Sequence, residues 1–320
     1  MVIDLQLVYG QAQRELAAVD EKMRQAVNTL SPTLREAAEY ALAGGGKRLR
    51  PLMTILTAKL GEAAVERVVP AAAALELVHL GSLVHDDIVD ESAWRRSQPS
   101  VNAKYGNKVA VLLGDFFFAR ALDLARQVGL DAVQSISRVI SNLVEGELEQ
   151  LRRSYDTTIT EEEYWERIQR KTASFIAECC RLGAIYSQDN PLAPETLHAY
   201  GLNLGLAYQV KDDLLDFTGK IDTVGKPTQR DLTAGVLTLP VIHTLQHHPR
   251  RQEIAQWIAG KDYDWTLVIN CMQEVGSFEF AQTRAEELIA TAKNTLAAAP
   301  EREAKTALLS LADYVLTRVS

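Results

Sequence analysis

The chain has 320 residues, of which 47% are hydrophobic and 24% are charged. These values are ordinary for a globular protein and exclude a disordered, collagen-like or low-complexity chain. The 34 basic and 42 acidic residues give a formal net charge of −8. General nucleic-acid binding depends on a basic surface, so we do not expect it. The same acidic balance argues against lasting attachment to anionic lipid.

The cysteines favour a reducing setting. Cys179 and Cys180 are adjacent, Cys271 is distant, and no Cys-x-x-Cys pair is present. A structural zinc site or a redox dithiol is therefore not expected, and we expect a cytoplasmic protein. The N-terminal segment contains Asp4 and lacks the apolar run of a signal peptide. The longest near-apolar stretch, 68–75, is shorter than the ~20 residues that span a bilayer.

Helix-forming residues dominate from one end of the chain to the other. Ser31-Pro32 is typical of a helix start, and apolar residues recur at helical spacing around 75–84 and 168–182. Glycines and prolines predict breaks at 44–46, 98–99, 190–191, 225–227 and 248–249. No linker-like segment separates these helices, so we predict one all-α domain over 1–320. A repeat solenoid is the alternative, but no period of about 34 to 47 residues is found.

Two acidic motifs, Asp-Asp-x-x-Asp, lie at 86–90 and 212–216 within apolar surroundings. Residues four apart share one face of a helix, so the first and last aspartates of each motif form a carboxylate pair. Like charges at this spacing repel each other unless something binds them. Mg²⁺ prefers oxygen ligands and bridges carboxylates to phosphate oxygens. The alternative, two solvated helix faces, is disfavoured by the apolar residues around both motifs.

Basic residues complement these acids. The segment 44–51, Gly-Gly-Gly-Lys-Arg-Leu-Arg-Pro, places a glycine turn before three cations, which suits an anion. It lacks the spacing of a P-loop, and taken alone it is as compatible with an ordinary surface loop. Further polar residues in apolar helices or turns are Arg95, Arg96, Lys171, Thr172 and Lys226. In an acidic chain, this grouping suggests an anionic ligand bridged by metal, such as diphosphate.

Taken in order, these motifs resemble the trans-isoprenyl diphosphate synthase family. The resemblance extends over about residues 40–245 and is carried by segments 44–51, 74–122, 145–151, 170–184, 200–217, 225–227 and 238–242. It implies an isoprenoid synthase fold, a single helical bundle around a central cavity. It also implies a Mg²⁺-dependent condensation of isopentenyl diphosphate with an allylic diphosphate. A dry, apolar cavity would protect the carbocation from water.

The resemblance implies a role for each matching residue. The first motif would hold Mg²⁺ against the allylic diphosphate through Asp86 and Asp90, with Asp87 supporting. The second motif would bind a further Mg²⁺, with about three ions in each site, through Asp212, Asp213 and Asp216. Thr172 and Gln209 would direct dipoles at the carbocation.

The diphosphate groups would be bound by cations. Residues expected to bind isopentenyl diphosphate are Lys47, Arg50, His79 and Arg96. Residues expected to neutralise the allylic diphosphate are Arg95, Lys171 and Lys226. From sequence alone a lone histidine is more often structural, and only its position in the motif favours a binding role for His79. The matching acids at 145–150 are expected to hold the acidic rim.

Product length is predicted from helix geometry. Gly81 and Ser82 precede Asp86 by about one turn, and Val78 by about two, at about 5.4 Å per turn. Family members that stop at fifteen or twenty carbons often carry a bulky aromatic residue at the first level. Here the residues at that level have small side chains, so we expect the floor of the product cavity to be open there. We expect Phe117 and Phe118 to form a deeper wall, and a product of about six to eight units. The alternative is that Gly81 only permits close helix packing.

Two departures from the family pattern affect partners. Gln229 replaces a glycine, and Val236 stands where a lysine often contacts the allylic diphosphate. A weaker allylic site or a small partner subunit would follow, whereas the resemblance itself implies a homodimer. A short-chain farnesyl or geranylgeranyl diphosphate synthase is the other alternative. A terpene cyclase would lack the 44–51 segment, and a non-catalytic subunit would have lost one aspartate motif. The apolar product makes transient membrane contact plausible.

Overall fold

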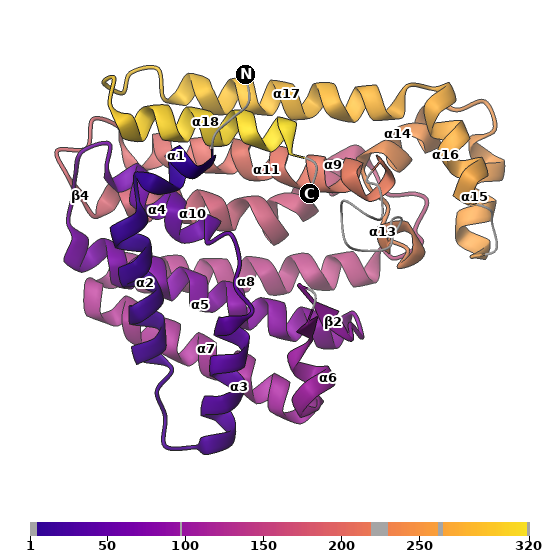
Figure 1. The fold of residues 1–320 in the computed structure, drawn as a ribbon. Helices are drawn as coiled ribbons and strands as arrows, with labels where there is room; N and C mark the ends of the chain where they lie inside the picture. Colours follow the sequence, from indigo (N-terminus) through magenta and orange to yellow (C-terminus); the bar gives the residue numbers. More distant parts are fainter. Residues whose placement is uncertain (1–4, 97, 219–229, 262–264, 319–320) are drawn as a thin grey trace. The chain divides into compact units, whose positions relative to one another are not determined.

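The computed structural model describes residues 5–96, 98–218, 230–261 and 265–318. Predicted site residue Lys226 and the departure at Gln229 lie outside them. Regular structure in the described residues is almost entirely helical (Figure 1), which confirms the all-α fold class. The described strands have two residues each and pair antiparallel. They are β1 (Glu62–Ala63) with β4 (Ser187–Gln188), and β2 (Trp94–Arg95) with β3 (Gln98–Pro99).

The chain forms two compact units, and a single domain over 1–320 stays a prediction. The first unit comprises 1–141, 178–198 and 298–308, and the second 142–177, 199–297 and 309–320. Described helices wholly in the first unit are α1 (Leu5–Gly10), α2 (Gln13–Ala26), α3 (Pro32–Ala43), α4 (Leu49–Ala58), α5 (Val65–Val89), α6 (Val101–Tyr105) and α7 (Asn107–Val128). Described helices wholly in the second are α9 (Glu161–Ile168), the π-helical turn η1 (Gln169–Ala173), α13 (Arg230–Thr233), α14 (Leu239–His247), α15 (Arg251–Gly260), α16 (Trp265–Glu274) and α17 (Ser277–Thr295). Unit boundaries fall within α8 (Leu130–Arg152), α10 (Ser174–Ile185), α11 (Pro194–Thr218) and α18 (Glu303–Thr317).

The predicted helix start at Ser31-Pro32 is confirmed. Helix α3 begins at Pro32, and the Ser31 hydroxyl accepts a hydrogen bond from the Leu34 amide at 3.4 Å. Such a cap satisfies one of the amides that have no partner within the helix. The break predicted at 44–46 follows the end of α3, the break at 248–249 lies between α14 and α15, and residues 98–99 form the short strand β3.

Helix α5 is the core of the first unit. It packs on α2 and α4, and most extensively on α7, beside which it runs in Figure 1. Residues 71–75 are fully buried, and the four alanines among them let neighbouring helices approach closely. In length and composition α5 also resembles a membrane span, but 78% of its most apolar window is buried inside the protein. Helix α5 is therefore the core helix of a globular unit and not a membrane span.

Helices α4 and α10 also approach closely, because Gly183 of α10 has no side chain. A Cβ at Gly183 would overlap the Thr57 hydroxyl and the Thr54 carbonyl oxygen, and would lie 3.1 Å from the Ala58 amide nitrogen. Two of these three atoms belong to the backbone of α4, so they have little freedom to move away. The absence of a Cβ therefore sets the distance between the two helices.

We predict that Gly183→Ala lowers the free energy of unfolding by about 1–3 kcal/mol, because the added methyl group overpacks this contact. Urea unfolding measures the change. The control is Gly260→Ala, where nothing lies within 4 Å of the new Cβ. Its unfolding free energy should change by less than ~0.5 kcal/mol. Equal midpoints for Gly183→Ala and the unchanged protein would contradict this description of the contact.

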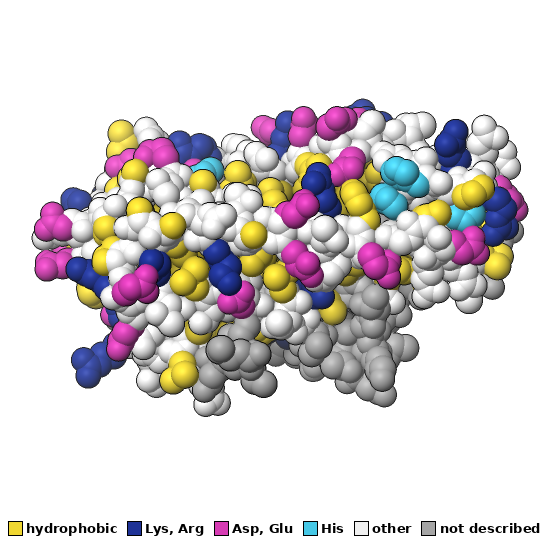
Figure 2. All heavy atoms as spheres, turned by 90° about the horizontal axis from the view of Figure 1, so that it is seen from above, with side chains coloured by type: hydrophobic (Ala, Val, Ile, Leu, Met, Phe, Trp, Pro, Cys, Tyr) yellow, Lys and Arg dark blue, Asp and Glu magenta, His cyan; other side chains and the backbone are white. Residues whose placement is uncertain are grey.

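Charge is mixed on the face seen in Figure 2. Acidic and basic side chains there are interspersed with apolar ones, and the described residues on this face show no broad field of one sign. This distribution agrees with the formal net charge of −8. It offers nucleic acid no extended basic surface on that face.

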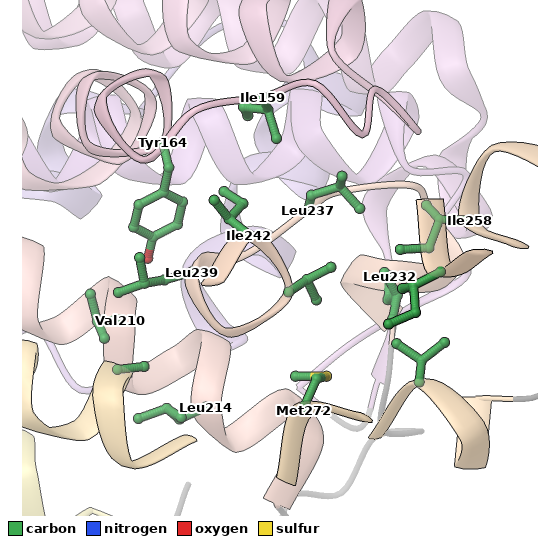
Figure 3. Close-up of a cluster of buried hydrophobic side chains, with 14 of the residues drawn as sticks. Ile159, Tyr164, Val210, Leu214, Leu232, Leu237, Leu239, Ile242, Ile258 and Met272 are labelled. Atoms are coloured by element: carbon green, nitrogen blue, oxygen red, sulfur yellow. The ribbon is translucent and has the colours of Figure 1, made fainter. Parts of the chain in front are cut away.

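The second unit has its own apolar core, shown in Figure 3. Tyr164 from α9, Val210 and Leu214 from α11, and Leu239 and Ile242 from α14 meet there, all at least 94% buried. The ring of Tyr164 is directed into this cluster with its hydroxyl on the side of α11 (Figure 3). A buried hydroxyl needs a hydrogen-bond partner, and the partner of Tyr164 is a residue of the second aspartate motif.

Candidate active site

The first aspartate motif lies at the C-terminal end of α5. Asp86 is half-buried and Asp90 is exposed, and the amide of Asp90 donates to the carbonyl of Asp86 at 2.8 Å. The two residues are four apart, so they share a face as predicted. Asp87 is about 100° round the helix from Asp86, and it is buried. Metal binding by Asp86 and Asp90 stays a prediction.

Asp87 has a different partner from the one we expected. Its Oδ1 accepts a hydrogen bond from Arg95 Nε at 2.9 Å, and its carbonyl accepts one from Asn102 Nδ2 at 3.2 Å. The carboxylate therefore joins α5 to β2 and helps to hold the backbone there. Support of Mg²⁺ by Asp87 stays a prediction. Arg95, which we expected to neutralise the allylic diphosphate, forms this pair with 27% of its side chain still exposed.

The glycine segment 44–46 lies against the turn that follows Arg95. Gly46 has φ +144°, and a Cβ there would lie 2.5 Å from Arg96 Nη1 and 2.8 Å from Arg96 Cζ. A Cβ on Gly44 would likewise lie 2.6 Å from Gln98 Nε2. Only residues without side chains let the Arg96 guanidinium rest on this loop. The loop is therefore shaped to bring Arg96 close to the cations that follow the glycines.

The basic residues surround the middle of α5. His79 lies in the positive field of Arg50 and Arg96, and burial is the main reason that its pKa falls well below the usual value. The imidazole is thus neutral at pH 7 and can donate a hydrogen bond without adding charge. Burial also lowers the pKa of Arg96, opposed by the nearby Glu76. Lys47 is exposed.

Sequence reasoning missed two members of this cluster, Arg48 and Glu76. Arg48 donates to Glu76 Oε1 at 3.1 Å and to Asp20 Oδ1 at 2.9 Å. Glu76 is 2% exposed, and burial raises its pKa, although Arg50 and Arg48 oppose the rise. A buried acid among arginines reduces their mutual repulsion. The sequence offered one indication of Glu76, because it is a single acidic residue within the apolar run before His79.

The second aspartate motif lies in α11 and repeats this arrangement. Asp213 is 2% exposed; its Oδ1 accepts from Gln209 Nε2 at 2.9 Å and its Oδ2 from the Tyr164 hydroxyl at 2.7 Å. Burial raises the pKa of Asp213 to about 6. Both oxygens have protein partners, which gives Asp213 a role inside the unit. Binding of Mg²⁺ by Asp213 stays a prediction.

The other aspartates of the second motif also contact described residues. Arg318 donates to the Asp212 carboxylate and, at 3.2 Å, to the carbonyl of Tyr208, whose ring lies 3.8 Å from the guanidinium carbon. Asp216 accepts from the backbone amide of Asp231 at 3.2 Å. Burial and the neighbouring aspartates raise the pKa of Asp231 to about 7. Sequence reasoning missed Arg318 and Asp231. Asp231 lies between Gln229 and Val236, the two departures from the family pattern, and Arg318 lies beyond the resemblance.

Lys171 and Thr172 lie in the π-helical turn η1, which the sequence did not predict. Lys171 Nζ lies 2.5 Å from Glu147 Oε2, and the Thr172 hydroxyl donates to Gln209 Oε1 at 2.8 Å. Thr172, Gln209 and Asp213 thus form one chain of hydrogen bonds. The predicted contacts of Lys171 with diphosphate, and of Thr172 and Gln209 with a carbocation, stay predictions.

The predicted chain-length positions lie on α5 and α7, and their effect on product length stays a prediction. A Cβ on Gly81 would lie 2.7 Å from Phe118 Cε1 and 3.1 Å from the Gly114 carbonyl oxygen, so α7 fills the space beside Gly81. Gly81 is about 140° from Asp86 round the helix, whereas Ser82 is about 40° away. Phe118 therefore contacts α5 about one turn below the motif. Val78 and Phe117 are fully buried, and Ser82 is half-buried.

The chemistry of Asp86 and Asp90 fits a hard divalent cation. Mg²⁺ usually takes one or two protein carboxylates and completes its octahedron with water and substrate phosphate. Within the described ranges, no group of three or more His, Cys, Asp or Glu side chains stands ready to hold a metal. Asp86 and Asp90 share one face of α5, which matches the two-carboxylate form of such a site. A metal site completed by substrate is therefore consistent with these residues.

Comparison with known proteins identifies the family. Residues 31–275 match the family model described as polyprenyl synthetase. The chain belongs to the polyprenyl synthetase family. It is 35% identical over 315 residues to heptaprenyl diphosphate synthase component 2 of Geobacillus stearothermophilus, covering 97% of this chain and 98% of that protein. It is 32% identical over 316 residues to a prenyl transferase of Synechocystis, covering 98% of each.

Solved structures of this family have the same fold. The polyprenyl synthase from Caulobacter crescentus, complexed with calcium and isoprenyl diphosphate, matches with a TM-score of 0.91 and 32% identity, covering 100% of this chain and 99% of that one. The decaprenyl diphosphate synthase from Rhodobacter capsulatus matches with a TM-score of 0.91 and 31% identity, covering 98% of both. These likenesses confirm the isoprenoid synthase fold. The two aspartate motifs lie in different units, and their apposition across a cavity stays a prediction.

We predict that Tyr164→Phe lowers the free energy of unfolding by about 1–3 kcal/mol, because buried Asp213 loses a donor. Urea unfolding measures the loss. The control is Tyr155→Phe, whose hydroxyl donates to the carbonyl of Thr233 at a partly exposed position. There water can replace the lost donor, and we expect a change below ~1 kcal/mol. Losses of equal size in the two variants would contradict an internal role for Asp213.

Proposed function

We propose that the protein joins isopentenyl diphosphate to an allylic diphosphate and makes a long-chain all-trans polyprenyl diphosphate. The observation that carries the proposal is the arrangement along α5. His79, in the arginine cluster, precedes Asp86 by seven residues, which is about two turns or ~10 Å on the same face. One helix thus presents an anion site and a carboxylate pair at a separation that suits two diphosphates.

The residues of the chain have distinct tasks in this reaction. Arg50 and Arg96 hold the diphosphate of isopentenyl diphosphate, and neutral His79 donates to it without adding to the charge. Asp86 and Asp90 present oxygens on the side of the allylic substrate. Divalent cations, about three per site, would neutralise the allylic diphosphate when bound and so make it a better leaving group.

The chemistry requires no protein nucleophile. The bond between the allylic carbon and its diphosphate oxygen breaks, the double bond of isopentenyl diphosphate attacks that carbon, and a proton is lost. The released diphosphate can accept this proton. Lys171 stabilises the departing anion, and the Thr172–Gln209 pair directs its dipoles at the developing positive charge. Buried apolar residues such as Val78 exclude water from the growing chain.

We predict that the purified chain converts isopentenyl diphosphate and farnesyl diphosphate into polyprenyl diphosphates, and that EDTA abolishes the reaction. Asp86→Asn should lower kcat by about 10²–10³, because one carboxylate ligand becomes neutral. Asp123→Asn, at an exposed aspartate of α7, is the matched control and should retain full turnover. Radiolabelled isopentenyl diphosphate and thin-layer chromatography measure both. Full turnover by Asp86→Asn would contradict the proposal.

Long products are supported by the relatives, which are named for heptaprenyl and decaprenyl diphosphate. We propose about six to eight isoprene units, at about 5.4 Å per turn of α5. Ser82 shares the face of Asp86, and its hydroxyl donates to the His79 carbonyl at 2.9 Å. Its small side chain adds little bulk on that face one turn below the motif, which supports the proposal. Farnesyl or geranylgeranyl diphosphate synthesis is the alternative.

We predict that Ser82→Phe shortens the product by at least about one unit, because the ring fills one turn of the path. Reversed-phase chromatography of the dephosphorylated products measures their length. Thr291→Phe, at an exposed position of α17, is the control and should leave the length unchanged. An unchanged product from Ser82→Phe would place the path elsewhere.

Assembly is part of the same proposal. Helix α7 exposes apolar side chains at Val111, Leu112 and Leu122, with 42% to 63% of their surface accessible. Such a stripe supports a homodimer. A cytoplasmic location stays a prediction. The component name of the Geobacillus relative and Val236 support the alternative, a small partner subunit. Turnover by the purified chain alone distinguishes the two, and only transient membrane contact is expected.

A further inference from the structure

The helix that carries Lys171 and Thr172 is interrupted by a wider turn. Helices α9 and α10 continue each other through η1, where the amide of Ser174 donates to the carbonyl of Gln169 five residues earlier. A π-helical turn inserts one residue into an α-helix, is rare, and occurs mainly at functional sites. Something in the surroundings must therefore favour it here.

Two neighbouring helices leave room for this turn because each has a glycine beside it. A Cβ on Gly146 of α8 would lie 3.0 Å from the amide nitrogen of Lys171 and 3.2 Å from its Cα. A Cβ on Gly205 of α11 would lie 2.6 Å from Ala173 Cα and 3.3 Å from its carbonyl oxygen. Most of these atoms are backbone, and the wide turn occupies the volume that the missing side chains would fill. Neither glycine has positive φ, so conformational freedom is not the reason for them.

The same two helices also hold the side chains of the turn. Glu147, next to Gly146, pairs with Lys171 at 2.5 Å. Gln209, one turn after Gly205, accepts a hydrogen bond from Thr172 at 2.8 Å. Each helix therefore supplies both a close backbone contact and a polar partner. Backbone position and side-chain direction are fixed together.

We propose that Gly146 and Gly205 are positioning residues, whose missing side chains keep η1 in its π-helical form and thereby orient Lys171 and Thr172. The inference rests on the prenyl transfer proposed above. A Cβ at Gly205 would displace the turn or return it to an α-helix. Loss of the extra residue rotates the following residues by about 100° relative to the preceding ones. Lys171 and Thr172 would then lose their alignment with Glu147 and Gln209.

The experiment compares Gly205→Ala with Gly183→Ala. Gly183 lies further along the same continuous helix and also packs closely, but against α4. For Gly205→Ala we expect kcat to fall about tenfold or more and the KM for the allylic diphosphate to rise, because the catalytic groups are misplaced. The KM for isopentenyl diphosphate should stay within about twofold, because its proposed binding residues lie on other elements. Gly183→Ala should lose stability and keep both KM values.

Two further measurements make the result independent of activity. Amide hydrogen exchange at 169–174 should quicken in Gly205→Ala by more than its loss of stability accounts for, and in Gly183→Ala by no more than its loss of stability accounts for. Adding Ala173→Gly to Gly205→Ala should restore part of kcat, because it removes the Cβ that lies 3.0 Å from the new methyl group. If Gly205→Ala fails to fold, Gly146→Ala, with its milder contact, takes its place.

The inference is overturned if exchange at 169–174 is unchanged in a folded Gly205→Ala or Gly146→Ala. It is also overturned if the Gly183 and Gly205 variants lose activity only in proportion to their loss of stability. Failure of the proposed function is a separate result, because the unchanged protein would then make no prenyl product. In that case the exchange measurement still tests the role of the two glycines.

Discussion

The burial of one carboxylate in each aspartate motif is the constraint on which the rest of the site depends. An uncompensated buried charge is costly, so Asp87 and Asp213 must have partners, and each has them within its own unit. Successive residues of a helix point about 100° apart, so fixing the second aspartate also fixes where the first and last ones point. The middle aspartate thereby orients the pair expected to meet the substrate.

Charge balance governs the basic side of the site in a similar way. Several arginines lie close to His79, and their mutual repulsion is reduced by buried Glu76, which pairs with Arg48. The histidine responds by remaining neutral, so the cluster gains a hydrogen-bond donor without a further charge. Gly46 completes the arrangement by letting the Arg96 guanidinium approach the backbone. The basic arginines, the acidic Glu76 and the neutral His79 together form a compact anion site.

The sequence was sufficient for features that depend on spacing along one helix. Two Asp-Asp-x-x-Asp motifs predict two carboxylate pairs because residues four apart always share a face. Contacts between helices carry no such rule. Gln209 contacts Asp213 at this same spacing within α11, but the other partner, Tyr164, comes from α9. The pairing of Lys171 with Glu147 depends on a π-helical turn that the helix-forming residues there do not predict.

Gly81 shows that direction matters as well as distance. Its distance below Asp86 follows from the rise of the helix, but five residues also turn the helix by about 140°, away from the face of Asp86. The structure shows it against Phe118 of α7. Glu76, by contrast, was visible in the sequence as a lone acid in an apolar run. Its meaning depends on Arg48, whose approach only the fold reveals.

The contact between Arg318 and Asp212 joins residues that are 106 positions apart in the chain. During synthesis on the ribosome, α11 emerges long before its arginine partner does. Until then the Asp212 carboxylate must remain hydrated or bind a cation from solution. Any polypeptide that stops short of residue 318 would keep every aspartate of the motif and still lack this counter-charge. The second unit therefore gains the counter-charge of Asp212 only when synthesis reaches its last residues, even if its helices form earlier.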